Sequence, residues 1–407
     1  MDLQITPKKL SGAVTPPASK SQAHRLLIAA ALAEGESTLH GIARSQDIEA
    51  TLRCITALGG SWTETAPGTL TVTGIGGRRF SGGEPPLLDC GESGSTLRFF
   101  LPIALAVAGG GVFTGRGRLM ERPQGPYFQL FDRKGIRYAQ KGGVLTVRGT
   151  LTPGEYVLPG NVSSQFFTGL LFALPLLDRG SAVVSSTEIE SREYLTMTLE
   201  TMRQAGVTAA ERPGLGRFEV LHAAYRPFEA AVEADWSQAA FWYAANFLGG
   251  EVDILGLDPR SAQGDMAVSE HYWRLARPGE AEIDVSGCPD LLPPLAVMAA
   301  VRSGTTRFTN AARLRIKESD RLSTTAALLA ALGGRAEEGP DFLTVHGGPL
   351  TGGTVDSAND HRIAMMAAIA ATGCTGPVTI RGAECVQKSY PDFWEVYRSL
   401  GGDIHVL

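Results

Sequence analysis

The sequence has few of the features that would assign it at once to a common class of protein. It has five cysteines, an odd number, and none of them forms a Cys-x-x-Cys pair. Scattered cysteines of this kind are typical of a reducing compartment and give no zinc signature. No apolar run is long enough to cross a bilayer, and the first residues lack the pattern of a secretory or transit peptide. We therefore expect a cytoplasmic protein without a membrane partner.

Positive charge and aromatic residues are also scarce. The 407 residues include 37 lysines and arginines against 42 aspartates and glutamates, a formal net charge of −5. Because no basic stripe or tail is present, nucleic acid is not expected as a partner. Aromatic residues make up 7% of the chain, whereas 49 glycines predict many tight turns. A chain of this length exceeds one ordinary core, which favours two domains.

The chain does contain an internal repeat. A glycine followed by a short β-rich run recurs at intervals of mostly roughly 70 residues, beginning at Gly35, Gly111, Gly180, Gly250, Gly304 and Gly376. The interval between Gly250 and Gly304 is shorter. Each run is followed by a polar turn and an amphipathic helix that ends in glycine, such as 47–58, 194–205 and 390–400. One or two short strands follow in most units.

A second type of helix also recurs, and it is apolar on nearly every side. Its members are 26–33, 97–108, 166–177, 239–248, 291–300 and 363–371. A helix that is hydrophobic all round is buried. The buried helices, the amphipathic helices and the short strands together predict an α/β fold. It would consist of a βαβ-type unit repeated six times, three units in each of two domains.

Reactive and cationic residues gather at the starts of the buried helices. They are Lys20-Ser21 with Arg25, Glu92-Ser93-Gly94-Ser95 with Arg98, Ser163-Ser164-Gln165, Asp235-Trp236-Ser237, Asp290, and 359–362. Polar residues are ordinary helix caps, so each group alone is weak evidence. Helix N-termini also attract anions, however. If these starts converge, they form an anion-binding cleft for a small polyphosphorylated or polycarboxylated substrate.

The segment 313–321 has the densest charge in the sequence. Four cations surround Glu318 and Asp320 between a strand-like run, 305–309, and a helix-like run, 322–329. Ser319 or Asp320 is the expected helix cap. Taken alone, the segment is best interpreted as a salt-bridged surface turn. Its functional interpretation is a carboxylate among cations that transfers protons on a bound anion.

Other motifs allow two interpretations each. The segment 16–21 lacks the glycine pattern of a nucleotide phosphate loop, so it is either a Pro-initiated helix start or a phosphate site. The segment 115–123 is a solvated loop or a mobile clamp for a carboxylate. The segment 360–362 is a surface cap or part of a site. Asp290 is harder to dismiss, because it directly precedes a buried helix.

Taken together, these elements resemble the enolpyruvyl transferases, in the branch that acts on shikimate 3-phosphate. The match covers nearly the whole chain and keeps the motifs in order. They are Ser19-Lys20-Ser21 with Arg25, 91–98, Glu121-Arg122-Pro123, Ser163-Ser164-Gln165, Pro289-Asp290, 317–321, Asp360-His361-Arg362 and Lys388. A chance match to one of these motifs is easy, but a chance match to all of them is not.

The resemblance implies a two-domain fold of six βαβαββ-like units. One domain would comprise 1–18 and 233–407, the other would be 19–232, and both would close over the substrates in the cleft between them. It implies transfer of the enolpyruvyl group of phosphoenolpyruvate to the 5-hydroxyl of shikimate 3-phosphate, through a tetrahedral intermediate and with release of phosphate. This is a step of the shikimate pathway to aromatic amino acids. Neither a metal nor an organic cofactor is expected. The expected oligomeric state is a monomer.

The resemblance also implies residue roles, position by position. Asp290 matches the proton acceptor for the 5-hydroxyl, Glu318 matches the group that moves protons at the methylene carbon, and Lys20 contacts both substrates. The residues that match shikimate 3-phosphate contacts are Lys20, Ser21, Arg25, Ser163, Ser164, Gln165, Ser191, Asp290 and Lys317. Those that match phosphoenolpyruvate contacts are Lys20, Gly94, Arg122, Gln165, Arg321, Arg362 and Lys388. Arginine suits bidentate contacts to phosphate and carboxylate.

Three positions depart from the commoner pattern of the family. Glu92 stands where asparagine is frequent, Ser95 where threonine is frequent, and Arg313 where some members have asparagine. A carboxylate at Glu92 would repel phosphoenolpyruvate unless it is turned away or paired, for which Arg98 is a candidate.

Two alternatives to this assignment stay open. A sister enzyme that acts on UDP-N-acetylglucosamine usually has a cysteine in the loop matching 115–123, and this loop has none. A non-catalytic polyanion-binding protein of the same fold would keep the arginines, but it would not need Asp290 and Glu318.

Overall fold

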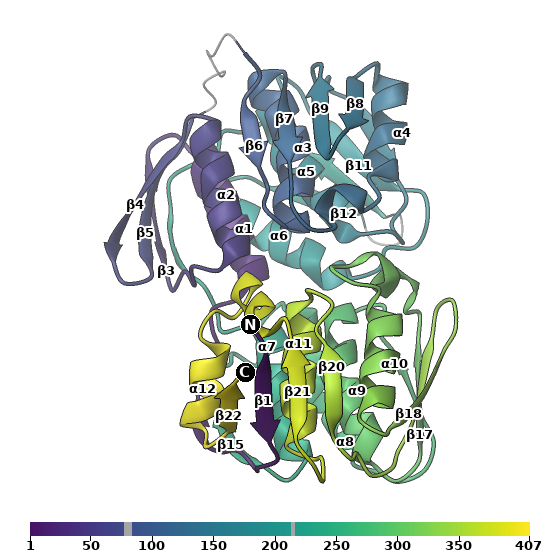
Figure 1. Ribbon diagram of the computed structural model, residues 1–407. Coiled ribbons are helices and arrows are strands. Elements are labelled where there is room, and N and C mark those ends of the chain that lie inside the picture. The colour runs from purple at the N-terminus through teal and green to yellow at the C-terminus, as the bar shows by residue number, and fades with distance from the viewer. Residues whose placement is uncertain (77–83, 213–215) are drawn as a thin grey trace. The chain divides into compact units, whose positions relative to one another are not determined.

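The computed structural model describes residues 1–76, 84–212 and 216–407 (Figure 1). The chain forms two compact units. Unit 1 comprises Met1–Pro17 and Ala234–Leu407, and unit 2 comprises Ala18–Glu233. The resemblance implied a change of unit after residue 18 and again after residue 232. Each unit has its own sheets and its own apolar core.

One pattern of strands and helices is repeated along the chain. A strand leads into a buried helix, a second strand runs parallel to the first, and an amphipathic helix and an antiparallel hairpin complete the sheet. Unit 2 has two unbroken copies. The first is β6 (Leu87–Asp89), α3 (Gly94–Ala108), β7 (Gly110–Thr114), α4 (Gly125–Lys134), β8 (Arg137–Lys141) and β9 (Val144–Arg148). The second is β10 (Glu155–Leu158), α5 (Ser164–Ala173), β11 (Ser181–Ser185), α6 (Arg192–Gln204), β12 (Ala209–Arg212) and β13 (Arg217–Val220).

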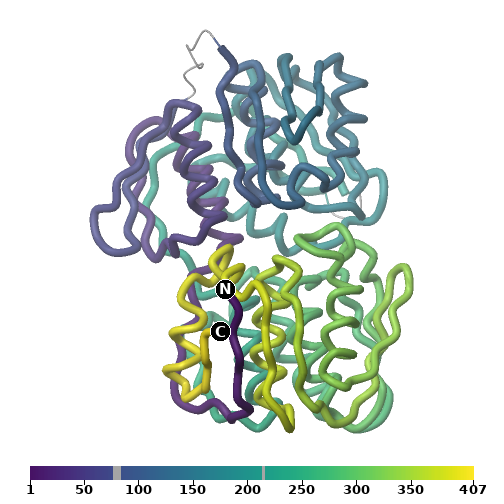
Figure 2. Tube along the Cα trace, in the orientation of Figure 1, coloured from purple at the N-terminus to yellow at the C-terminus, as the bar shows by residue number. Residues whose placement is uncertain are grey.

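Unit 1 contains two further copies of the pattern. One is β16 (Ala281–Asp284), α9 (Leu292–Val301), β17 (Thr305–Thr309), α10 (Arg321–Ala331), β18 (Arg335–Glu338) and β19 (Leu343–His346). The other is β20 (Gly353–Asp356), α11 (His361–Ala371), β21 (Val378–Arg381), α12 (Phe393–Ser399), β22 (Asp403–Val406) and β1 (Leu3–Thr6). Because β1 pairs with β22, the first and last strands lie side by side in unit 1 (Figure 2).

The two remaining copies exchange their first strands where the chain passes between the units. One consists of α1 (Lys20–Leu32), β3 (Glu36–His40), α2 (Gln46–Ala57), β4 (Ser61–Ala66), β5 (Thr69–Thr73) and, from far along the chain, β14 (Glu229–Ala231). The other consists of α7 (Trp236–Phe247), β15 (Glu251–Ile254), α8 (Val268–Leu275) and, from the beginning of the chain, β2 (Ser11–Val14). Thus β2 precedes α1 but pairs in unit 1, whereas β14 precedes α7 but pairs in unit 2.

The irregular spacing in the sequence has a structural cause. Among the described residues, the sheet of β15 and β2 is two-stranded and the copy that contains α8 lacks a closing hairpin. The missing hairpin shortens the interval between Gly250 and Gly304. The α/β class and the repeated unit expected from the sequence are confirmed.

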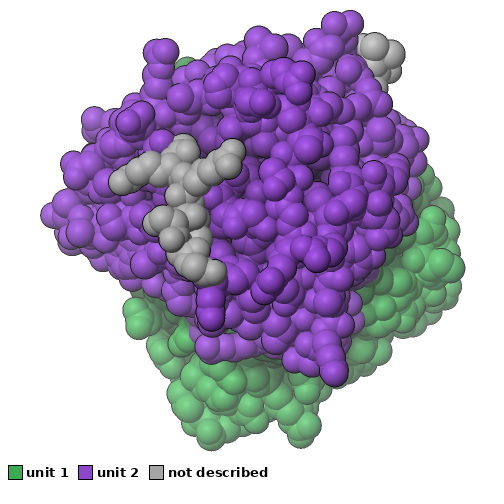
Figure 3. All heavy atoms as spheres, turned by 90° about the horizontal axis from the view of Figure 1, so that it is seen from above, with its two compact units in different colours: residues 1–17, 234–407 green, residues 18–233 purple. Residues whose placement is uncertain are grey.

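Figure 3 shows the two units in separate colours. The buried helices contribute much of the apolar core of each unit. Every residue of α11 is buried, as is every residue of α9 except the last. Burial of a large aliphatic side chain contributes about 1.5–3 kcal/mol, so these helices supply much of the stability. The helix expected at 166–177 ends at Ala173, because Pro175 lacks the N–H that an α-helix needs there. Of the helices described, none is both long and apolar enough to cross a membrane.

Candidate active site

The charged segment 313–321 divides into an outer and an inner part. On the outer side, Arg315 pairs with Asp320 at 2.7 Å and with Glu338 at 2.9 Å. Asp320 is the N-cap of α10, and its carboxylate accepts the Ser323 N–H at 3.2 Å. Arg321, the first residue of α10, faces inward and is 1% exposed. A surface turn therefore describes Arg315 but not Arg321.

The Arg321 guanidinium binds three carboxylates. Its Nη1 lies 2.7 Å from Asp290 Oδ1, its Nη2 2.6 Å from Glu318 Oε2, and its Nε 2.8 Å from Asp360 Oδ2. Ser319 Oγ donates to the same Asp360 oxygen at 3.0 Å. Burial alone would lower the pKa of Arg321, but Asp360, Glu318 and Asp290 together raise it above its ordinary value. Arg321 is therefore a fixed positive charge at the centre of this cluster.

Asp290 lies in the short 3-10 turn Pro289–Leu291 that precedes α9, and it accepts hydrogen bonds from further cations. Lys317 Nζ lies 3.4 Å from its Oδ1, and Arg362 Nη2 lies 3.3 Å from its Oδ2. Burial would raise the pKa of Asp290, but Arg362, Lys317 and Arg321 outweigh that effect and hold the pKa well below its usual range. Burial lowers the pKa of Lys317 despite the neighbouring Asp290. Asp290 is thus an ionised carboxylate surrounded by positive charge.

The start of α11 provides Arg362 and holds one further cation, Lys388. Asp360 is the N-cap and accepts the Arg362 N–H at 3.0 Å. Asp360 and His361 are both buried, so the surface-cap interpretation of this segment is wrong about its location. Lys388 Nζ, from the 3-10 segment Ala383–Lys388, donates to Asn359 O at 2.6 Å. The starts of three consecutive buried or amphipathic helices of unit 1 therefore meet around Arg321 and Asp290.

In unit 2, Lys20 is held by a carboxylate that the sequence did not single out. Lys20 is the first residue of α1, and its Nζ lies 2.7 Å from Asp47 Oδ2. Asp47 lies in the first turn of α2 and is 7% exposed. An acidic residue in a first turn is common because of the helix dipole, so its sequence position carried no special signal.

Arg25, a little over one turn along α1, is buried against neutral groups. It donates to Thr198 Oγ1 at 2.9 Å, to Ser21 O at 2.7 Å and to Tyr194 O at 3.1 Å. Its guanidinium also lies over the ring of Phe99, 5.4 Å from the centroid. Burial lowers the pKa of Arg25 to about 10. Among its hydrogen bonds to described residues none goes to a carboxylate, so a bound anion would be stabilised here.

The helix α6 brings the Arg25 partners into place. Tyr194 and Thr198 lie on this helix, and Ser191 is its N-cap. The backbone of Ser191 is left-handed, with φ of 52°, and the residue is buried. The structure therefore places Ser191 at the start of the helix that contacts Arg25. The sequence had not indicated Tyr194 or Thr198 as partners of Arg25.

The starts of α3 and α5 are joined by Gln165. Its Oε1 accepts from Arg98 Nη1 at 2.8 Å, and its Nε2 donates to Ser95 Oγ at 2.9 Å. Ser163, the N-cap of α5, accepts the Gln165 N–H at 3.3 Å, and Ser164 follows as the first residue of the helix. A Cβ atom added to Gly94 would lie 2.6 Å from Arg122 Nη1 and 3.7 Å from Gln165 Oε1. Gly94, Arg122 and Gln165 therefore form one group.

The unusual residues Glu92 and Arg313 have defined surroundings. The Glu92 carboxylate lies against Gly117, where an added Cβ would be 2.5 Å from Glu92 Oε2. Arg98, the suggested partner of Glu92, donates to Gln165 and to Pro123 O. Arg313 donates to the carbonyl oxygen of Ser286. The Glu92 side chain thus extends toward the loop 115–118.

The residues expected at the site fall into two groups, one in each unit. The group in unit 1 consists of Asp290, Lys317, Glu318, Arg321, Arg362 and Lys388. The group in unit 2 consists of Lys20, Ser21, Arg25, Gly94, Arg122, Ser163, Ser164, Gln165 and Ser191. Throughout the described ranges, no group of histidine, cysteine, aspartate or glutamate side chains could hold a metal ion. Both groups are rich in cations at helix starts, which suits small polyanions.

Solved structures with the same fold define the class. An EPSP synthase from Acinetobacter baumannii superimposes with a TM-score of 0.80 at 24% identity, covering 100% of both chains. The enolpyruvyl transferase NikO from Streptomyces tendae gives a TM-score of 0.80 at 18% identity, covering 99% of this chain and 98% of the other. At such identities the likeness establishes the fold alone, which is that of the enolpyruvyl transferases.

Sequence comparison narrows the class to one family. The family model described as EPSP synthase (3-phosphoshikimate 1-carboxyvinyltransferase) matches residues 5–397. Proteins named 3-phosphoshikimate 1-carboxyvinyltransferase from Clostridium acetobutylicum and Clostridioides difficile are each 41% identical. Each alignment covers 99% of this chain and 98% of the relative. The chain belongs to the EPSP synthase family.

Proposed function

We propose that this protein transfers the enolpyruvyl group of phosphoenolpyruvate to the 5-hydroxyl of shikimate 3-phosphate and releases phosphate. The observation that carries the proposal is the cluster around Arg321, in a chain that belongs to the EPSP synthase family. A carboxylate held among cations is suited to proton transfer on an anionic substrate. The product is an intermediate of aromatic amino-acid biosynthesis.

Shikimate 3-phosphate is assigned mainly to the group in unit 2. Arg25 is a buried cation that, among the described residues, donates only to hydroxyl and carbonyl oxygens, and it lies on the same helix as Lys20. The assigned contacts are Lys20, Ser21, Arg25, Ser163, Ser164, Gln165 and Ser191, with Lys317 and Asp290 from unit 1. Hydroxyl and amide groups bind the substrate hydroxyls, whereas the cations bind its phosphate and carboxylate.

Phosphoenolpyruvate is assigned to cations from both units. Arg122 and Gln165 lie beside Gly94, whose missing side chain lets the Arg122 guanidinium approach the backbone of the first turn of α3. The assigned contacts are Lys20, Gly94, Arg122, Gln165, Arg321, Arg362 and Lys388. Because residues of both units take part, the proposal requires that the units close over the substrates during turnover.

Proton transfer is divided between two carboxylates. Asp290 accepts the proton of the 5-hydroxyl as that oxygen bonds to C2 of phosphoenolpyruvate, while Glu318 delivers a proton to C3. The resulting tetrahedral intermediate then returns a proton from the new methyl group to Glu318 and expels phosphate, which restores the double bond. Proton transfers of this kind contribute about 10²–10⁴ in rate each.

The test is release of phosphate from phosphoenolpyruvate, followed with each candidate acceptor. Release that requires shikimate 3-phosphate and yields the enolpyruvyl ether, detected by proton NMR, is the expected result. Release that instead requires UDP-N-acetylglucosamine would assign the protein to the sister reaction. Tight binding of both substrates without any release would identify a non-catalytic polyanion-binding protein.

Two further properties belong to the proposal. The five cysteines are all free, which suits the reducing cytoplasm as the place of reaction. The complete set of assigned residues lies in one chain, so a monomer suffices. Gel filtration with light scattering would test the monomer.

A further inference from the structure

A buried chain of hydrogen bonds connects the starts of three helices in unit 2. His24 of α1 bonds through Nδ1 to Thr51 Oγ1 of α2 at 2.8 Å, and Thr51 Oγ1 bonds to Thr96 Oγ1 of α3 at 2.8 Å. Thr96 Oγ1 donates to Ser93 Oγ, the N-cap of α3, also at 2.8 Å. None of these four residues is more than 1% exposed. We call this set the His24–Ser93 chain.

The order of donors along the chain is determined. Thr96 gives its hydroxyl proton to Ser93, so Thr51 must donate to Thr96 and must itself accept from His24 Nδ1–H. His24 Nε2 is then the unprotonated nitrogen, which agrees with its having no donor among the described residues. Burial, with Lys20 and Arg25 nearby, lowers the pKa of His24 well below its ordinary value. The imidazole therefore stays neutral and keeps this tautomer.

The His24–Ser93 chain lies close in sequence to the proposed substrate contacts, but it contains none of the lysines or arginines assigned to substrate binding. His24 follows Lys20 by one helical turn and directly precedes Arg25. Thr51 follows Asp47, the partner of Lys20, by one turn of α2. Ser93 directly precedes Gly94. The helix α2 therefore contacts Lys20 with one side chain and the start of α3 with another.

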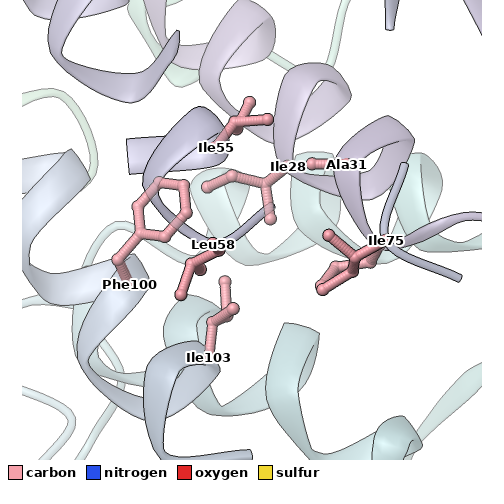
Figure 4. A pocket seen from close by; sticks show the side chains of 8 residues that line it. Ile28, Ala31, Ile55, Leu58, Ile75, Phe100 and Ile103 are labelled. Atoms are coloured by element: carbon pink, nitrogen blue, oxygen red, sulfur yellow. The ribbon is translucent and has the colours of Figure 1, made fainter. Parts of the chain in front are cut away.

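The next layer of the same three helices is apolar. Four residues beyond His24, Thr51 and Thr96, in each helix, stand Ile28, Ile55 and Phe100, which line a small apolar cavity of about 10 Å³ (Figure 4). Apolar contacts are not directional and fix the relative position of helices less sharply than hydrogen bonds do. The polar layer therefore supplies the directional contacts between the helix starts.

From these contacts we propose that the His24–Ser93 chain is a positioning element for phosphoenolpyruvate. It holds the first turn of α3, which contains Gly94, in a fixed place relative to Lys20 at the start of α1. The role rests on the proposed function, because Gly94 and Lys20 are the contacts assigned there. His24, Thr51 and Thr96 act through these residues and do not touch the substrate.

The experiment compares valine and serine at the central hydroxyl. Thr51→Val keeps the shape of the side chain and removes its hydroxyl group. Thr51→Ser keeps the hydroxyl group and removes the methyl group. At saturating shikimate 3-phosphate, Thr51→Val and Thr96→Val should each lower kcat/KM for phosphoenolpyruvate about tenfold. Thr51→Ser should remain within about twofold of wild type. The double valine variant should lose no more than one single variant, since one break already interrupts the chain.

Thr325→Val is the matched control. Thr325 is a fully buried helical threonine of α10 whose hydroxyl has no hydrogen-bond partner in the described parts of the chain. Its variant should stay within about twofold of wild type. Unchanged kcat/KM for phosphoenolpyruvate in Thr51→Val and Thr96→Val, or losses that multiply in the double variant, would overturn the positioning role.

A second measurement does not depend on activity. Amide hydrogen exchange in residues 93–98 should be faster in Thr51→Val than in wild type, although the substitution is on a different helix. Unchanged exchange there would overturn the proposal even if turnover fell. An inactive wild-type protein would refute the proposed function instead, and the exchange experiment would still decide whether the chain holds the start of α3.

Discussion

Arg321 Nη1 lies 2.7 Å from Asp290 Oδ1, so the proposed base and a proposed phosphoenolpyruvate ligand share one ion pair across 31 sequence positions. Arg362 and Lys317, together with this pairing, hold the pKa of Asp290 below its usual range despite burial. A bound phosphate or carboxylate would compete with Asp290 for the guanidinium groups of Arg321 and Arg362, and it would weaken their interaction with Asp290. The pKa of Asp290 then rises, and the carboxylate becomes a better base once phosphoenolpyruvate is present.

Replacing the proposed base should separate turnover from binding. Asp290→Asn removes the negative charge and the proton acceptor, so kcat should fall by about 10²–10⁴. The affinity for phosphoenolpyruvate should not weaken, because the amide no longer competes for Arg321 and Arg362. Steady-state rates and calorimetric titration measure the two quantities. Glu338→Gln, which removes an outer partner of Arg315, is the control and should leave kcat unchanged.

Near-normal turnover in Asp290→Asn would refute its role as the base. A loss of phosphoenolpyruvate affinity equal to the loss of turnover would show instead that Asp290 organises the cations and does not accept the proton.

Asp360 should stabilise the folded protein more strongly at neutral pH than at low pH. It is 0% exposed and accepts from both Arg321 and Ser319, and its removal leaves a buried guanidinium less compensated. Asp360→Asn should therefore lower the free energy of unfolding by about 3–5 kcal/mol at pH 7, measured by urea denaturation. Asp258→Asn, which removes an exposed ion pair with Arg260, is the control and should have little effect.

The pH dependence of this effect has a definite sign. Burial alone would raise the pKa of Asp360, but Arg321 outweighs burial and lowers it below its ordinary value. The stabilisation is then fully present above about pH 4 and is lost as the pH falls through the lower, folded-state pKa. The difference between wild type and Asp360→Asn should narrow below about pH 4. A difference that stays constant down to pH 2 would contradict this account.

The repeated unit could be predicted because its signals are local. Helices apolar on every side, such as α11, differ visibly from amphipathic ones, and glycines mark where each repeat turns. The exchange of β2 and β14 between units could not be predicted from the residues alone. Both strands are short and pair in parallel with strands far away in the chain, which local pattern does not encode.

In the candidate site, too, only the residues with a local signal could be predicted from the sequence. Helix starts marked Lys20 and Asp290, because cations and carboxylates are conspicuous beside buried helices. The partners that orient such residues were not visible in the sequence. Thr198, which holds Arg25, is 173 positions away, and Asp47 looks like any acidic residue in a first turn. Such partners are defined by tertiary packing.

Asp47 should matter for catalysis through Lys20. Its Oδ2 lies 2.7 Å from Lys20 Nζ, so Asp47→Asn weakens a charge-assisted hydrogen bond and lets the ammonium group move. We expect kcat/KM to fall about tenfold for both substrates, since Lys20 is assigned to both. Glu49→Gln, on the same turn of α2 and paired with Arg44, is the control and should change neither value. If both variants behave alike, Asp47 does not orient Lys20.

A side chain at Gly94 should weaken binding of phosphoenolpyruvate without destabilising the fold. A Cβ at Gly94 would lie 2.6 Å from Arg122 Nη1, the end of a flexible side chain that can move aside. Gly94→Ala should therefore keep the wild-type melting temperature but raise KM for phosphoenolpyruvate about tenfold. KM for shikimate 3-phosphate should be unaffected.

Gly125→Ala is the matched control, because Gly125 is also the first residue of a helix and a Cβ there meets nothing within 4 Å. Alanine favours a helix over glycine, so this variant should be as stable as wild type or more so, with both KM values unchanged. Thermal melts and initial rates measure both variants. An unchanged KM for phosphoenolpyruvate in Gly94→Ala would mean that Arg122 can move without loss and is not a ligand. A lowered melting temperature would instead mean that Gly94 is required by the packing of α3.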